Sequence, residues 1–231
     1  MSALEVLDPG PLTTIQDLGR PGWAHLGVPP SGAVDQVMLA EANALAGNAD
    51  DAAALEATLV GPTLRALVPG TVAVVGTRNG DGAHALEAGD VLETGPTLGA
   101  RAYIALRGGI DAEPTLGSRS TDLLTGLGPP PLARGERLSA GSAAKPASSA
   151  QRAASHPEGP FRVHLGPRDD ELLSEGLVTG ALQVPPNGLP ILLLNDHPTT
   201  GGYPVIAVVS ARDLPRAGQL KPGDELRFAV A

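Results

Sequence analysis

Cysteine is absent from this chain of 231 residues. Its absence excludes a disulfide framework, a zinc site built from thiolates and a cysteine nucleophile. Aromatic residues are also scarce, at 2% of the sequence, so leucine, valine, isoleucine and alanine must supply the core. Apolar residues reach 42%, which is ordinary for a globular protein and enough to form a folded core at this length.

Long apolar runs and clustered basic residues are missing as well. No 18 consecutive residues are apolar, and residues 1–7 lack a basic segment followed by an apolar one, so neither a membrane span nor a signal peptide is expected. The net charge of −9 and the lack of Lys and Arg clusters argue against nucleic acid as a partner. These absences favour a cytoplasmic protein.

Several short motifs of known chemistry do not occur. The G-x-x-x-x-G-K-[ST] phosphate cradle is missing, so the chain binds no cofactor through a recognisable motif, and use of ATP would need another subunit. The G-x-S-x-G pattern of a nucleophilic serine is missing too. The five histidines show no metal-ligand spacing, so no metal site is predicted.

What the sequence does contain is a series of short apolar runs separated by glycine, proline and aspartate. Their even spacing predicts a mainly-β fold, a barrel or sandwich of many strands. One main helix is predicted over Gln36–Ala46, where apolar residues recur at helical spacing between a capping Asp35 and a terminating Gly47. The predicted strands are Leu4–Val6, Ala57–Val60, Thr71–Val75, Val91–Thr94, Ala102–Leu106, Val163–Leu165 and Ala181–Val184.

A change in composition divides the chain. Residues 139–160 are rich in alanine, serine and proline and cannot bury enough apolar surface to order themselves, so they are predicted to form a linker. This linker separates a larger N-terminal part, residues 1–138, from a smaller C-terminal part, residues 161–231.

The segment Leu189–Ser210 concentrates more polar chemistry than any other. Its two apolar runs, Ile191–Leu194 and Val205–Val209, are predicted as strands buried on both faces. Glycines between them allow the backbone to approach a ligand closely, but loops are also polar simply because they are solvated. Spacing alone therefore leaves a ligand site and a connecting loop equally open. The polar centre consists of Asn195, Asp196, His197, Thr199, Thr200, Gly201, Gly202 and Tyr203.

A second polar segment follows the first predicted strand. With Gly19 and Gly22 nearby, Asp17 and Arg20 lie on a predicted tight loop. Two interpretations remain open: a local salt bridge, which contributes little stability when exposed, or a polar pair at the rim of a pocket. Arg119, in the segment GSRSTD, is a further candidate for binding an anion.

Three stretches of the sequence carry a resemblance to one family. They are GPLTTIQDLGRPGWAHLGVPPSGAVD from Gly10, RGGI from Arg107 with LGSRSTD from Leu116, and NDHPTTGGYPVIAVVSARDLPRAGQLKPGDELRF from Asn195. These stretches resemble the family of the 5-oxoprolinase C subunit, also known as allophanate hydrolase subunit 2 or the kinase-inhibitor antagonist. That family is related to the biotin-dependent carboxyltransferase domain of urea carboxylase. The resemblance covers nearly all of the chain outside the predicted linker.

The resemblance implies a fold of two β-barrel-like subdomains, similar to cyclophilin, that associate with a sister subunit built from related domains. Family members act with other subunits in the ATP-dependent opening of 5-oxoproline to glutamate, or as components of allophanate hydrolases or carboxyltransferases. On this basis the chain is expected to be a hydrolase subunit that acts on an amide C–N bond of a small amide or ureido substrate. One alternative is a non-catalytic module that binds a sister subunit or a regulatory partner protein, and another is a degraded family member without activity.

One departure from the family pattern concerns the second subdomain. After Gly166–Asp170 the family pattern continues through several strands before it reaches an SEG motif, whereas here Ser174–Gly176 follows almost at once. A few dozen residues of the pattern are missing, so the second subdomain is expected to be shortened.

The resemblance also implies roles for the polar residues. Asp196 and His197 are expected to handle protons during catalysis, while backbone N–H groups of the glycine-containing centre would bind an oxyanion or carboxylate. An arginine would neutralise a substrate carboxylate, because a guanidinium group donates two parallel hydrogen bonds to it. The residues expected to bind the substrate are Arg20, Arg119, Asn195, Thr199, Thr200, Gly201, Gly202 and Tyr203.

Overall fold

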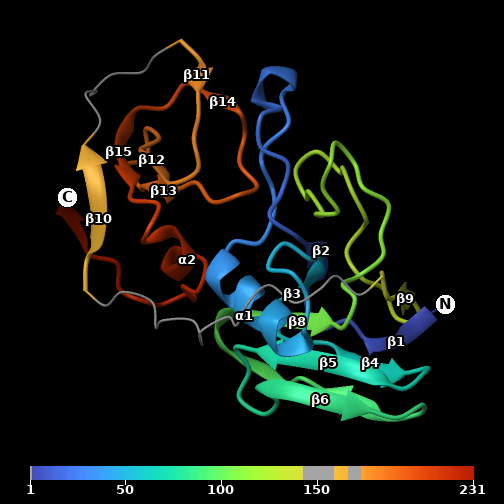
Figure 1. The fold of residues 1–231 in the computed structure, drawn as a ribbon. Helices are drawn as coiled ribbons and strands as arrows, with labels where there is room; N and C mark the ends of the chain where they lie inside the picture. Colours follow the sequence, from blue (N-terminus) through green and yellow to red (C-terminus); the bar gives the residue numbers. More distant parts are fainter. Residues whose placement is uncertain (1, 143–158, 166–172) are drawn as a thin grey trace.

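The computed structural model describes residues 2–142, 159–165 and 173–231. Within them the fold is mainly β with one principal helix, as the sequence predicts (Figure 1). The N-terminal strands are β1 (Ser2–Asp8), β2 (Thr13–Gln16), β3 (Ala54–Val60), β4 (Thr63–Ala66), β5 (Gly70–Val75), β6 (Gly82–Leu86), β7 (Val91–Glu93), β8 (Pro96–Leu106) and β9 (Arg137–Ser139).

These strands form two sheets that share one core. A four-stranded sheet has the order β7-β4-β1-β9, and a five-stranded sheet has the order β2-β3-β8-β5-β6. Val6 and Leu64 from the first sheet belong to the same buried cluster as Val74 and Ile104 from the second, and each is at most 1% exposed. Such burial stabilises the fold by about 1.5–3 kcal/mol for each side chain. The buried members of this cluster are all aliphatic, as the scarcity of aromatic residues requires.

Helix α1 (Gln36–Ala46) packs on the outer face of the five-stranded sheet. Asp35 caps its N-terminus by accepting a hydrogen bond of 3.1 Å from the backbone N–H of Met38. Gly47, with φ of 76°, ends it in the left-handed conformation that glycine adopts most readily. The fully buried Leu39 packs against the sheet, so the predicted helix is confirmed at both ends.

The C-terminal part contains a second five-stranded sheet. Its order is β13-β12-β15-β10-β16, and β11 and β14 form a separate two-stranded pair. A small core that includes Phe161 and Val163 lies between this sheet and the short helix α2. The elements are β10 (Phe161–Leu165), β11 (Glu175–Gly176), β12 (Ala181–Gln183), β13 (Ile191–Leu192), β14 (Thr200–Gly201), β15 (Val205–Val209), α2 (Leu214–Ala217) and β16 (Phe228–Val230).

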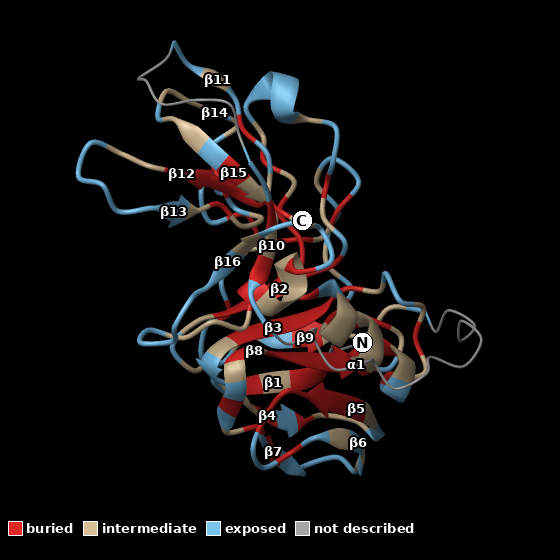
Figure 2. Cartoon of the chain, turned by 90° about the vertical axis from the view of Figure 1, so that its left-hand side faces the viewer, coloured by how far each residue is buried: buried red, intermediate tan, exposed pale blue. Residues whose placement is uncertain are grey.

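The two apolar runs of the segment Leu189–Ser210 are not strands buried on both faces. The first is a strand only over β13, at the edge of its sheet, where Ile191 is 46% exposed. Strand β15 lies inside the sheet, but the burial of its residues varies: Ala207 and Val209 are buried, whereas Ile206 is 41% exposed. Figure 2, coloured by burial, shows exposed as well as buried segments in this sheet. That prediction is wrong because β13 is an edge strand and part of β15 faces solvent, although separate buried clusters around Leu182 and Ala181 lie on opposite faces of β12.

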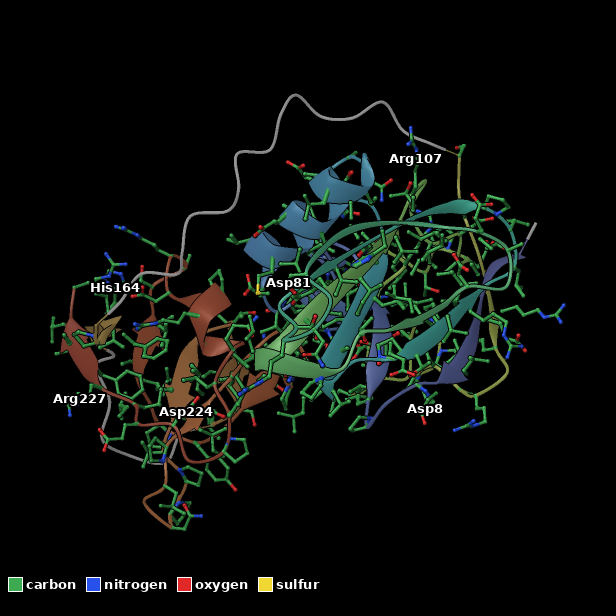
Figure 3. The ribbon with its side chains drawn as sticks, turned by 90° about the horizontal axis from the view of Figure 1, so that it is seen from below. Asp8, Asp81, Arg107, His164, Asp224 and Arg227 are labelled. Carbon is green, nitrogen blue, oxygen red and sulfur yellow. The ribbon has the colours of Figure 1, made fainter. Side chains whose placement is uncertain are left out.

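The two parts of the chain meet beside α1. Gln219, just after α2, accepts a hydrogen bond of 3.1 Å from the backbone N–H of Arg101 and donates one of 2.7 Å to Asp35. Figure 1 shows α2 between α1 and the C-terminal sheet. Figure 3 shows the molecule from below, with His164 on the C-terminal part and Asp8 on the N-terminal part.

Most of the predicted linker, residues 143–158, lies outside the described residues. Residues 166–172, where the family pattern is interrupted, lie outside them as well. The boundaries 1–138 and 161–231 therefore stay a prediction. In the parts of the chain that the structure describes, no helix is both long and apolar enough to cross a membrane.

Candidate functional site

Loops from both parts of the chain converge on the polar centre of the segment Leu189–Ser210. The Asn195 side-chain amide donates hydrogen bonds to the carbonyl groups of Gly32 at 3.1 Å and Ala33 at 2.9 Å. The backbone N–H of Ser31 donates one of 3.3 Å back to the Asn195 carbonyl. We call residues 17–20, 30–33, 115–127 and 195–197 the junction loops. Asn195 therefore joins these loops in addition to its predicted role toward a substrate.

Among the junction loops, Asp196 carries an exposed carboxyl group whose pKa is raised. The residue is exposed, yet protein packed around the carboxyl group and the negative charges of Asp122 and Glu56 raise its pKa to about 6. Hydrogen bonds from the Leu123 backbone N–H, at 3.4 Å, and from the Ser31 side chain act in the opposite direction. A carboxyl group tuned in this way exchanges protons near neutral pH, as a general acid or base must.

Asp122 is held rigidly next to Asp196. Its side chain is buried and accepts hydrogen bonds from the backbone N–H of Leu124 at 2.9 Å and of Thr125 at 3.3 Å, and from the Thr125 hydroxyl group. These bonds close a tight turn that carries Leu123 against Asp196. The position of the Asp122 charge is therefore fixed by its own turn.

Arg20 is almost fully buried, at 2% exposure. Its guanidinium group donates to the Thr115 carbonyl at 3.2 Å, to the Ser31 hydroxyl at 3.0 Å and to the Ser120 carbonyl. Three of its donors therefore hold protein loops together. Its predicted contact with a substrate carboxylate stays a prediction.

Asp17 organises the same loops from the other side. Its carboxylate accepts hydrogen bonds from the backbone N–H of Gly19 at 2.8 Å and of Arg119 at 2.6 Å, and from the hydroxyls of Ser118 at 2.5 Å and Ser120 at 2.6 Å. Ser120 thus links Asp17 to Arg20, so the two residues belong to one buried network. The Arg119 guanidinium group donates to the Ala112 carbonyl at 2.8 Å, and its anion-binding role stays a prediction.

His197 faces away from the partners of Asp196. Its ring is buried, with Nδ1 at 2.8 Å from the Pro198 carbonyl and Nε2 at 3.3 Å from the Thr179 hydroxyl. Because a carbonyl oxygen only accepts, Nδ1 carries a proton. The structure thus gives the two predicted catalytic residues separate surroundings, and it does not bring them together as a hydrogen-bonded pair.

The rest of the polar centre is partly used by the fold. Thr200 and Gly201 form β14 and pair with β11, while the Thr199 carbonyl accepts a hydrogen bond of 2.9 Å from Leu177. A Cβ atom at Gly201 would lie 2.9 Å from Leu177 Cδ1, so the Leu177 side chain would have to shift to admit one. Tyr203 is 43% exposed. Gly202 lies between Gly201 and Tyr203 in the sequence. Substrate binding by the five residues from Thr199 to Tyr203 stays a prediction.

Sequence reasoning missed Ser31, Asp122 and a buried carboxyl group at Glu56. Glu56 accepts hydrogen bonds from the Tyr103 hydroxyl at 2.6 Å and the Val34 backbone N–H at 2.9 Å. Burial raises its pKa, although these bonds and the nearby Arg101 guanidinium oppose that change. A lone acid in the apolar run ALEATLV is a signal that could have revealed it.

Comparison with known proteins defines the family. The model of the carboxyltransferase domain, subdomains A and B, matches residues 26–172 and 159–230. The chain belongs to this carboxyltransferase domain family. Two relatives are the 5-oxoprolinase C subunit of Escherichia coli, 35% identical over 97% of this chain and 90% of the relative, and urea amidolyase of Lachancea kluyveri, 28% identical over 98% of this chain and 17% of the relative.

Solved structures agree with this assignment. The protein TTHA0988 superposes with a TM-score of 0.88 at 32% identity, over 99% of this chain and 56% of that one. The urea carboxylase of Kluyveromyces lactis gives a TM-score of 0.84 at 26% identity, over 98% of this chain and 27% of that one. The chain thus spans about half of the first solved chain and a smaller share of the second.

Proposed function

We propose that this chain is a subunit of a cytoplasmic, multi-subunit, ATP-dependent complex that opens 5-oxoproline to glutamate, or that acts on a related small amide or ureido substrate. The observation that carries the proposal is Asp196, an exposed carboxyl group with a pKa raised to about 6 where both parts of the chain meet. The likeness of the chain to the 5-oxoprolinase C subunit supports the choice of substrate.

In this proposal Asp196 accepts a proton from the water that attacks the amide carbonyl carbon, and it returns a proton to the nitrogen that leaves as the C–N bond breaks. Opening an amide requires proton transfer and stabilisation of the developing oxyanion. Asp196 in its ionised form is the base, and partner subunits bind ATP and complete the pocket. The raised pKa suits this task, because a base is most effective when its pKa lies near the working pH.

The test is to co-express the chain with its sister subunits and to measure ATP-dependent glutamate formation from 5-oxoproline. We expect Asp196→Asn to lower the rate by roughly 100-fold or more, while the complex still assembles. Asp51→Asn, which alters an exposed turn, serves as the matched control and should leave the rate unchanged. A rate within twofold of wild type for Asp196→Asn would refute the assignment.

The pH profile provides a second readout of the same proposal. Because Asp196 must be ionised to accept a proton, the wild-type rate should fall as the pH drops through about 6. In Asp196→Asn this fall should disappear, so the ratio of the two rates should shrink toward pH 5. A ratio independent of pH would show that another group is the base.

A second candidate is a non-catalytic module that binds a sister subunit or a regulatory protein. It is favoured by Leu123 and Leu124, which are 51% and 54% exposed at the tip of the turn beside Asp196. Exposed apolar side chains of this kind often mark protein contacts. If Leu124→Asp abolished assembly while Asp196→Asn left turnover intact, the binding module would be the better description.

A further inference from the structure

A cavity opens at one end of the core that the two N-terminal sheets share. Its volume is about 540 Å³, which lies within the range of small-molecule sites in proteins. Strands β1, β4, β5, β6 and β8 line it, together with the segment after β9. None of its lining residues belongs to the junction loops. The cavity is therefore separate from the surroundings of Asp196.

The cavity exists because glycine occupies an inward-facing position of β5. Side chains of a strand alternate between its two faces, and Val72 and Val74 both belong to the buried cluster between the sheets. Gly70 lies on the same face of β5, but a Cβ atom there would meet nothing within 4 Å. Gly70 is not among the glycines with positive φ, so its backbone conformation also suits other residues. Position 70 could therefore hold a side chain, and its lack of one leaves the space open.

Another wall of the cavity is a glycine turn after β8. Arg107 and Gly108 line the cavity, and both belong to the segment RGGI, which the reaction proposed above does not use. A Cβ atom at Gly108 would lie 2.6 Å from the carbonyl oxygen of Gly141, whose N–H donates a hydrogen bond of 3.0 Å to the Gly109 carbonyl. Backbone thus packs against backbone at this wall, and no side chain of these glycines fills the cavity.

Aliphatic side chains form much of the remaining lining. Leu4, Val72 and Leu106 are each at most 4% exposed. Leu86 and Ala140 are half-buried and pack against the same cluster from the open side. Cavities with such a lining exclude water and bind small apolar molecules. The composition of this wall therefore selects an apolar ligand.

The charged residues of the lining are Arg107 and Glu87, which are both exposed. Figure 3 shows the Arg107 side chain at the edge of the N-terminal part. Because the two charges are opposite in sign, together they favour neither an anion nor a cation. We propose that this cavity is a binding site for a small, uncharged, apolar molecule, such as an aromatic alcohol. The ligand occupies the space next to Gly70 and buries apolar surface that is otherwise open to water.

The experiment is an NMR titration of the full chain, labelled at leucine and valine methyl groups, with benzyl alcohol as the probe. We expect saturable shifts of the methyl signals of Leu4, Val72 and Leu106, and none at Leu182 in the C-terminal core. Gly70→Leu should fold, because its side chain enters open space, and should weaken the affinity by at least about tenfold by filling the cavity. Absence of saturable shifts in wild type overturns the proposal, and so does unchanged affinity in folded Gly70→Leu.

Two controls accompany this variant. Gly176→Leu places the same side chain at an exposed glycine of β11, where a Cβ atom also meets nothing within 4 Å, and should leave the affinity unchanged. If Gly70→Leu does not fold, the shorter side chain of Gly70→Val provides the test and should also weaken binding. Failure of both variants to fold overturns the proposal, because position 70 would then not border open space.

Matched probes test the class of ligand. Benzoate and benzylammonium share the ring of benzyl alcohol but carry a charge, so each should bind at least about tenfold more weakly, since the apolar wall offers that charge no partner. Tighter binding of either ion than of benzyl alcohol overturns the proposal. Loss of assembly with the sister subunits in Gly70→Leu, without binding of benzyl alcohol to wild type, also overturns it, because a side chain of a partner would then fill the cavity.

The cavity and the proposed reaction can be tested independently. Asp196→Asn should bind benzyl alcohol as wild type does, so failure of the proposed function leaves this site in place. Conversely, a chain that binds no apolar probe can still lose its activity in Asp196→Asn.

Discussion

At the scale of single residues, Asp17 and Asp8 show how far the surroundings decide what a carboxylate contributes. Asp17 is buried and accepts four hydrogen bonds from the junction loops. Asp8 makes an exposed ion pair of 3.1 Å with Arg134. Removing one partner from a buried network leaves the remaining polar groups without hydrogen bonds. In an exposed pair, water takes the place of the partner that is removed.

We therefore expect Asp17→Ala to lower the free energy of unfolding by about 3 kcal/mol. Asp8→Ala, the control, should change it by no more than about 1 kcal/mol. Urea denaturation followed by circular dichroism measures both. Equal effects of the two variants would show that the Asp17 network contributes nothing beyond a surface charge.

The candidate site was predictable from sequence only where its residues are neighbours in the chain. Asn195 and Asp196 lie together in a polar segment between apolar runs, and they could be singled out. Ser31 and Asp122 could not, because their relation to Asp196 arises when loops 70 or more positions apart come together. The hydrogen bonds that Arg20 donates to Ser31 and Ser120 likewise form only when these loops come together.

At the scale of elements, signals within one element predicted best. The ends of α1 follow from local chemistry, namely the side-chain cap at Asp35 and the left-handed Gly47. Strands that coincide with apolar runs, such as β3, β5 and β8, were predictable for the same reason, whereas β2, β4 and β6 were not. The burial of β13 was not, because the place of a strand in its sheet depends on partners far away in the sequence.

The space around two glycines in loops shows how tightly neighbouring segments are packed. Gly32 and Gly47 both have positive φ, of 88° and 76°. A Cβ atom at Gly32 would collide with backbone atoms of Gly19, whereas one at Gly47 would meet nothing within 4 Å. Backbone conformation alone thus penalises Gly47→Ala, while Gly32→Ala adds a collision.

We expect Gly47→Ala to lower the free energy of unfolding by about 1 kcal/mol and Gly32→Ala by at least about twice that, since two loops must separate. Thermal unfolding of the two variants side by side measures the difference. Similar losses of stability would mean that the contact between residues 17–20 and 30–33 is looser than its distances indicate.

At the scale of the whole molecule, Gln219 makes several of the hydrogen bonds between the two parts. Gln219 binds Asp35 through its amide nitrogen and the Arg101 backbone through its amide oxygen, and its own carbonyl accepts from Ala100 at 2.9 Å. This residue therefore joins the C-terminal part to the cap of α1 and to β8. Replacing Gln219 should therefore weaken the contact between the two parts more than it weakens the folding of either part.

We expect Gln219→Ala to increase hydrogen exchange at the Arg101 amide by at least about tenfold, with little change at core amides of β3, because the loss is local. Gln36→Ala, an exposed residue at the start of α1, is the control and should alter neither. Exchange that rises equally in β3 would show that the two parts unfold as one unit.

The overall organisation was only partly predictable. Apolar runs and one helix predicted a mainly-β chain, and family motifs predicted its relatives, which the comparisons confirm. The contact of Asn195 with Gly32 spans 163 positions of sequence, and no local pattern encodes a pairing over that distance. The way the two parts meet, and with it the setting of Asp196, therefore had to come from the structure.

The scarcity of aromatic residues has one practical result at the junction loops. Trp23, the single tryptophan of the chain, lies between Arg20 and Ser31 in sequence and stacks on His25 with ring centroids 6.1 Å apart. Fluorescence of Trp23 therefore reports on the segment between Arg20 and Ser31, whereas far-ultraviolet circular dichroism reports on the sheets. Recording both during denaturation distinguishes opening of the loop that carries Arg20 and Ser31 from unfolding of the barrel-like parts, without an added dye.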